Sequence, residues 1–220
     1  MNWGIDFLQL GIKGAMERGV SAETIVLLLL VPLTATLVAI SRNMVGLNGF
    51  GIFVPLLVSV AFVYTGILAG TLLFLVIVLA TALARVVVRK LKLPYMPRMA
   101  MLVWVATMGV LLLLLVSPVL GMHQMIGLSI FPILLFMMLA EANIEAQITR
   151  TWQAAAIMTL ETLGIAIVGS SVIGSVNIQQ WVLTNPTLAA GGVLVIDFIV
   201  GKYKGLRLLE IWRFKKLWQG

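Results

Sequence analysis

Long apolar blocks separated by short polar segments make up most of the chain after residue 23. An α-helix needs roughly 17 to 25 apolar residues to cross a hydrocarbon core, and most of the blocks approach that length. The pattern therefore predicts an all-α, polytopic membrane protein with about seven transmembrane helices. The predicted spans cover residues 24–40, 49–64, 67–84, 99–116, 125–140, 152–173 and 187–200.

The first twenty residues follow a different pattern. Apolar side chains recur there at three- and four-residue steps, at Ile5, Leu8, Ile12 and Met16, which predicts a helix lying along the membrane surface. The features of a signal peptide are missing, so we expect this segment to stay in the mature protein. We divide the chain into an outer N-terminal segment (1–20), a seven-helix membrane domain (21–201) and a basic cytoplasmic tail (202–220).

Composition and charge support this architecture. Hydrophobic residues make up 61% of the chain and charged residues 10%, with a mean hydropathy of +1.12, whereas soluble domains are roughly 45 to 50% apolar and 25% charged. All the lysines and arginines except Lys13 and Arg18 fall on one side of the predicted topology. Cytoplasmic loops collect positive charge, so we expect a bacterial inner-membrane protein with its N-terminus outside and its C-terminus inside. The net charge of +7 then requires no nucleic-acid partner.

Two short stretches indicate an internal repeat. Residues 44–47 (MVGL) and 52–55 (IFVP) resemble residues 125–132 (MIGLSIFP), allowing a four-residue insertion. The copies begin the second and fifth spans, and an odd separation gives them opposite orientations, as in a 3+3 inverted repeat with one additional helix. Pro55 and Pro132 would then interrupt the backbone at related positions, and any freed carbonyls would need a partner. Gly66 and Gly70 also have the GxxxG spacing of closely packed helices.

Catalytic and metal-binding signatures are missing from the sequence. The chain has no cysteine and a single histidine, His123, and it contains no HExxH, Gly-x-Ser-x-Gly or Asp-rich motif. We expect no cofactor, no metal and no enzymatic activity. Two carboxylates, Glu161 and Asp197, fall within predicted spans, where they either relay protons or bind a cation, or pair with basic residues and headgroups.

A polar group is predicted at the cytoplasmic ends of the helices. Its members are Arg42, Asn48, Glu141, Glu145 and Arg150, which either line a mouth for a substrate or partner or are solvated helix ends that set topology. The tail interleaves basic and aromatic residues, a mixture that binds anionic headgroups or a cytosolic partner. Its basic candidates are Arg207, Arg213, Lys215 and Lys216.

Four stretches carry a family resemblance: GLNGFGIFVPLLVSVAFVYTGILAGTLLF, RKLKLPYMPRMA, IGLSIFPILLFMMLAE and GKYKGLRLLEIWRF. They resemble the bacterial seven-helix membrane domain that is usually fused to, or encoded beside, an inactive transglutaminase-like domain. They are more distantly similar to the small membrane subunit of poly-gamma-glutamate capsule synthesis, which shares Gly-x-x-(Val/Phe)-Pro helix starts. The resemblance covers about residues 24–215 and includes no catalytic motif.

The resemblance implies a partner system, because members of these families accompany ATP-grasp or amide-ligase enzymes that join amino acids. Only about twenty residues precede the first span, so we expect any transglutaminase-like portion to be a separate periplasmic chain. The leading hypothesis is a non-catalytic, homo-oligomeric membrane subunit that anchors a cytosolic ligase for amino-acid polymer synthesis and export. The alternative is a small secondary transporter whose membrane carboxylates couple to protons.

Overall fold

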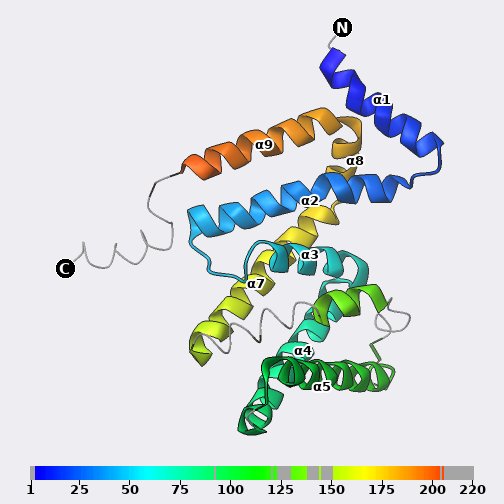
Figure 1. Cartoon of the computed structure of the whole chain (residues 1–220). Coiled ribbons are helices and arrows are strands. Elements are labelled where there is room, and N and C mark those ends of the chain that lie inside the picture. The colour runs from blue at the N-terminus through cyan, green and yellow to red at the C-terminus, as the bar shows by residue number, and fades with distance from the viewer. Residues whose placement is uncertain are drawn as a thin grey trace. The chain divides into compact units, whose positions relative to one another are not determined.

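The computed structural model describes residues 3–91, 93–119, 121–122, 130–137, 144, 151–203 and 205. This part of the chain consists of helices and short connections and contains no β-strand (Figure 1). It divides into two compact units. Residues 1–48 and 171–220 form the terminal unit, and residues 49–170 form the central unit.

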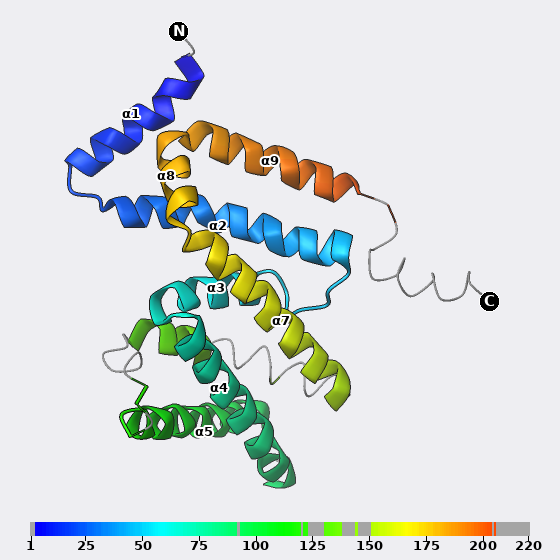
Figure 2. The same ribbon diagram turned by 180° about the vertical axis from the view of Figure 1, so that it is seen from behind.

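The terminal unit is built on two long helices that pack side by side. α2 and α9 run in the same direction in both views (Figures 1 and 2). α1 packs against α9, and the side-chain nitrogen of Gln9 donates to the carbonyl of Thr184 at 3.0 Å. α8 and α9 meet at Asn185 with a bend of 104°. The elements are α1 (Trp3–Glu17), α2 (Ala22–Ile40), the π-helical turn η1 (Ser41–Val45), α8 (Val176–Thr184) and α9 (Pro186–Lys202).

The central unit has an apolar core to which every one of its main helices contributes. Phe136 lies at its centre, with its ring centroid 5.9 Å from that of Phe62 and 6.4 Å from that of Phe74. Ala106 and Ala166 complete the core from two further helices. The elements are α3 (Phe53–Thr65), α4 (Ile67–Val88), the 3-10 turn η2 (Arg89–Leu91), α5 (Tyr95–Val116), the helical residues 130–137, and α7 (Trp152–Ile173), whose last residues belong to the terminal unit.

Hydroxyl groups inside the helices bond to the backbone of their own helix. Thr34, Ser59, Thr81 and Thr159 each donate to the carbonyl four residues earlier, at 2.7–2.9 Å. Such bonds satisfy a polar side chain without water. Helices with these side chains are therefore compatible with a lipid environment, where an unpaired polar group is costly.

The fold confirms the predicted class, an all-α polytopic membrane protein. Among the described residues, four helices are long and apolar enough to cross a membrane: α2 together with η1, α4, α5 and α7. The bent pair of α8 and α9 supplies a fifth candidate, and α3 is a shorter apolar helix. The interfacial position of the N-terminal segment and the domain division at residues 20 and 201 stay predictions.

Several predicted boundaries were wrong. The second span was expected from residue 49, but α3 starts at Phe53 because residues 49–52 form an irregular segment with Gly51 at φ +40°. Residues 85–98 lie between two predicted spans and were expected to form a loop, yet Pro97 occupies the first turn of α5, where a missing N–H costs no hydrogen bond. The polar residues after residue 174 were expected only to connect two spans, but residues 176–184 form the short helix α8.

The inverted repeat stays a prediction. Residues 123–129, which carry most of its second copy, lie outside the described residues. The central unit takes α3 and α4 from the first predicted half and α5 and α7 from the second. The two compact units therefore do not coincide with the two halves of the repeat.

The two positions of the GxxxG spacing favour glycine for different structural reasons. Gly66 lies between α3 and α4 with φ +78°, a conformation that favours glycine. Gly70 lies in α4, where an added Cβ would collide with the ring of Phe62 and lie 2.6 Å from Thr65 Oγ1. The close approach of α3 to α4 therefore requires the absence of a side chain at Gly70.

Replacing Gly70 with alanine should destabilise the central unit. We expect Gly70→Ala to lower the free energy of unfolding by about 1–3 kcal/mol, the usual cost of overpacking, measured as thermal unfolding in detergent. Gly164→Ala is the matched control, because no atom lies within 4 Å of the added Cβ on α7. Equal stability of the two variants would contradict the close packing of α3 on α4.

Candidate functional site

Basic residues of the terminal unit gather at one end of its helix pair. Because α2 and α9 are parallel, Arg42 in η1 and Lys202 in the last turn of α9 lie at the same end. Lys202 Nζ lies 4.3 Å from the ring centroid of Phe198. If the number of spans is odd, the first and last spans must run in the same direction. The helices at these two positions, α2 and α9, are parallel, as this requires.

Asp197 is on the exposed side of α9. It has no hydrogen-bond or ion-pair partner in the part of the chain that the structure describes, and it lies five residues before Lys202. A carboxylate so close to a helix end reaches the headgroup region more easily than one at mid-membrane. The structure thus places Asp197 near the basic end of the terminal unit.

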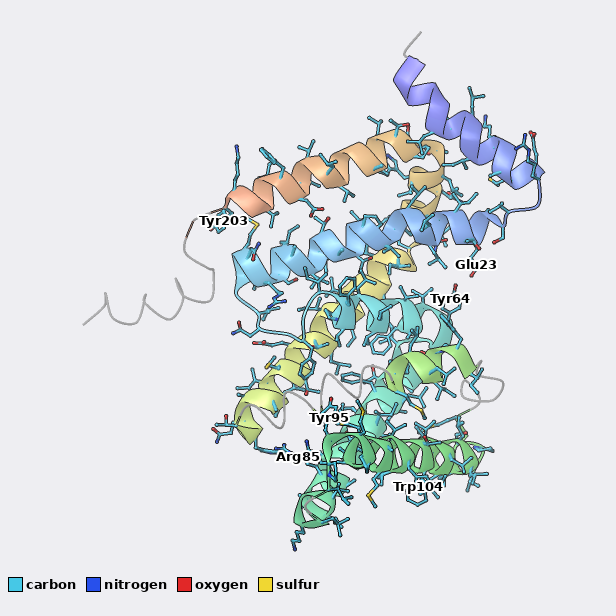
Figure 3. All side chains as sticks on the ribbon, viewed as in Figure 1. Glu23, Tyr64, Arg85, Tyr95, Trp104 and Tyr203 are labelled. Carbon is cyan, nitrogen blue, oxygen red and sulfur yellow. The ribbon has the colours of Figure 1, made fainter. Side chains whose placement is uncertain are left out.

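The central unit also has a basic end. Arg85 lies in the last turn of α4, Lys90 in η2 and Arg98 in the first turn of α5. Arg98 Cζ lies 5.8 Å from the ring centroid of Tyr95, and Arg85 and Tyr95 lie near this helix junction in Figure 3. Two of these cations, Arg85 and Arg98, were predicted to be in a loop but are on helix ends.

α7 begins at this same basic end. A small apolar pocket of about 210 Å³ is lined by Val78 and Ala82 from the second half of α4 and by Trp152 and Thr159 from the first half of α7. The second half of α4 thus faces the first half of α7, and the two helices run in opposite directions in both views (Figures 1 and 2). This is the arrangement expected for the third and sixth spans.

The most unusual backbone in the central unit precedes α3. The irregular segment, residues 49–52, packs against α7, and the backbone N–H of Phe50 donates to Thr162 Oγ1 at 2.9 Å. Gly49 is buried against the same residue, because an added Cβ would lie 3.0 Å from Thr162 Oγ1. Thr162 Oγ1 in turn donates to the carbonyl of Met158 at 2.7 Å.

This contact places the start of α3 halfway along a transmembrane helix. α7 has 22 residues, roughly 33 Å at 1.5 Å per residue, and Thr162 is at its middle. α3 has 13 residues, roughly 20 Å, which is too short to cross a core of roughly 30 Å. α3 is thus a short apolar helix whose start packs at the middle of α7, an arrangement like that of the discontinuous helices that form binding sites in transporters.

The two predicted helix-breaking prolines are both buried. Pro55 is the third residue of α3, where the backbone N–H has no intrahelical acceptor, so it frees no carbonyl. Pro132 lies in the helical residues 130–137. The interruption before α3 thus comes from the glycines at positions 49 and 51, not from Pro55.

Only some of the predicted site residues come together. Glu161 is half-buried beside Thr162 in α7, while Arg42 and Asp197 belong to the terminal unit, and Asn48 is exposed at the end of that unit. No group of three or more His, Cys, Asp or Glu residues able to hold a metal occurs among the described residues. The remaining candidates lie outside the described residues: His123, Glu141, Glu145, Arg150, Arg207, Arg213, Lys215 and Lys216.

Thr162 is the important residue that sequence reasoning missed. A threonine inside an apolar span is common, because its hydroxyl bonds to its own helix. The available signal was the pair of glycines at positions 49 and 51, which make a regular helix unfavourable there. A backbone segment without helical bonds requires an acceptor on a neighbouring helix.

The fold and its apolar helices define a multi-pass membrane protein. Residues 19–218 match the model of a family described as seven transmembrane helices usually fused to an inactive transglutaminase. The chain belongs to this family, as the resemblance of its sequence indicated. No curated protein and no solved structure matches the chain.

Removing the Thr162 hydroxyl should leave the Phe50 N–H buried and unpaired. We expect Thr162→Val to lower the free energy of unfolding by about 1–3 kcal/mol and to speed hydrogen exchange of the Phe50 amide. Thr162→Ser should retain both properties. Thr159→Val is the matched control, because Thr159 Oγ1 bonds only to the Ala155 carbonyl of its own helix. Indistinguishable stability of Thr162→Val and Thr159→Val would exclude this role for Thr162.

Proposed function

We propose that this chain is a non-catalytic membrane subunit that anchors a cytosolic peptide-ligating enzyme of the ATP-grasp or amide-ligase type. In the proposed assembly, the subunit retains or passes the amino-acid polymer that the ligase makes. The chain resides in a bacterial inner membrane, with its N-terminus outside and its C-terminus inside. A separate periplasmic transglutaminase-like chain is a second partner, and the subunit is a homo-oligomer.

The observation that carries the proposal is the gathering of cations at one end of the helices in each unit. The terminal unit has Arg42 and Lys202 there, and the central unit has Arg85, Lys90 and Arg98. By the positive-inside rule this end faces the cytoplasm. The basic tail follows α9 in the sequence, and in this proposal its cations bind an acidic surface of the cytosolic partner.

The family description supports a binding role over a catalytic one. Its members are usually fused to a transglutaminase that is inactive. A membrane domain that recurs with an inactive enzyme is more readily explained by binding and assembly than by turnover. Glu141, Glu145 and Arg150 would add polar groups to the same cytoplasmic face in this proposal.

A small secondary transporter is the second candidate function. The irregular segment before α3 favours it, because its backbone is hydrogen-bonded at the middle of α7 to Thr162, the residue that follows Glu161 in the sequence. Transporters commonly build substrate and coupling-ion sites at such interruptions near the midplane. In this alternative, Glu161 and Asp197 would couple transport to protons.

A pulldown of the tagged protein from its native membrane in mild detergent tests the two candidates. We expect mass spectrometry to identify an ATP-grasp or ligase-type enzyme among the retained proteins. Replacing Arg207, Arg213, Lys215 and Lys216 together with glutamine should weaken its recovery. Four exposed ion pairs at about 0.5 kcal/mol each amount to about 2 kcal/mol, roughly a 30-fold loss of affinity.

The double variant Lys13→Gln with Arg18→Gln is the control, since these two cations lie on the opposite predicted side. It should leave the recovery of the enzyme unchanged. Recovery of the chain alone as a stable homo-oligomer would contradict the anchoring proposal and favour the transporter.

A further inference from the structure

An apolar groove lies between α4 and α5 near the basic end of the central unit. It has a volume of about 460 Å³, within the roughly 300–1,000 Å³ of small-molecule sites. Its lining is apolar and largely exposed, with Trp104 63% accessible and pointing outward from α5 (Figure 3). The main lining residues are Leu83, Val87 and Leu91 on one side and Met101, Trp104 and Val105 on the other.

Positively charged residues lie next to the lining residues at one end of this groove. Leu91, which lines it, is flanked in sequence by Lys90 and Lys92, and Lys90 is exposed. Arg98 precedes the lining residue Met101 by three positions, so it lies on the same face of α5, one turn nearer the basic end. The apolar groove thus ends next to positively charged residues.

Arg98 also has an unused hydrogen-bond donor. Its Nε is buried and has no acceptor among the residues that the structure describes. Buried donors are nearly always paired, and a guanidinium is suited to bind phosphate oxygens. The basic end of the groove therefore combines positive charge with a guanidinium that is suited to phosphate oxygens.

We propose that this groove binds an anionic phospholipid, with an acyl chain against Trp104 and Val87 and the phosphate beside Lys90 and Arg98. The lining offers an acyl chain only apolar contacts, and the cations select the headgroup by charge. One phospholipid supplies both parts, whereas a protein segment would have to satisfy its own backbone at this depth and also neutralise the cations. Binding of a lipid here does not require the proposed enzyme partner, although both ligands would use Lys90 and Arg98.

Quenching of Trp104 fluorescence by brominated lipids tests the proposal on the full chain in phosphatidylcholine vesicles. Increasing fractions of brominated phosphatidylglycerol or brominated phosphatidylcholine are compared, and Trp104→Phe gives the share that Trp104 contributes. We expect phosphatidylglycerol to reach half-maximal quenching at a severalfold lower fraction. Lys90→Gln should reduce that preference by about fivefold, the effect of one cation near an anionic surface. Lys13→Gln should leave it unchanged.

A second pair of variants separates the groove from general surface charge. Val87→Phe fills the groove, whereas Val86→Phe adds the same ring at a neighbouring exposed position that does not line it. The preference for phosphatidylglycerol should disappear in the first variant and persist in the second. Equal quenching by the two lipids in the unmodified protein, equal preferences in both phenylalanine variants, or a Trp104 that neither lipid quenches would each overturn the proposal.

Discussion

The hydrocarbon core of a membrane contains no water to pair with backbone N–H and C=O groups, and this constraint governs the structure. Regular helices satisfy it through their own hydrogen bonds. The irregular segment before α3 cannot, so its Phe50 N–H is paired with Thr162 on α7 at 2.9 Å. The absence of a side chain at Gly49 permits the close approach to Thr162, and Gly51 adopts the positive φ of +40° that favours glycine. One side-chain hydroxyl therefore pairs a backbone group that the irregular segment cannot pair within itself.

The hydrocarbon core also determines where charged residues can lie along the helices. Lysines and arginines are excluded from the apolar middles of the helices and gather where the helices end, as Arg42 and Lys202 do in the terminal unit. Lys90 and Arg98 do so in the central unit, next to an open apolar groove. A cationic end suits both proposed ligands, an acidic partner surface and an anionic lipid, because the two use the same charges.

Sequence alone predicted the fold class and the existence of most helices, because a long apolar segment in a membrane must pair its own backbone groups and therefore forms a helix. It also indicated the family, through the runs at residues 46–74, 89–100, 126–141 and 201–214. It failed where tertiary contacts decide the outcome. The start of α3 depends on Thr162, a residue more than a hundred positions away, and the extension of α5 to Tyr95 depends on Pro97 being tolerated in a first turn. The candidate site depends on such contacts, so the sequence predicted residues near it, such as Pro55 and Glu161, but not Thr162 itself.

Single-cysteine labelling with a membrane-impermeant maleimide tests most directly the claim that the cationic helix ends share the cytoplasmic side. The chain has no cysteine of its own, so the introduced cysteine is the only residue of each variant that the maleimide labels. Glu23→Cys and Val119→Cys should react in intact spheroplasts, whereas Asn43→Cys and Lys90→Cys should react only after permeabilisation. Labelling of Asn43→Cys and Lys90→Cys from opposite sides would contradict the account.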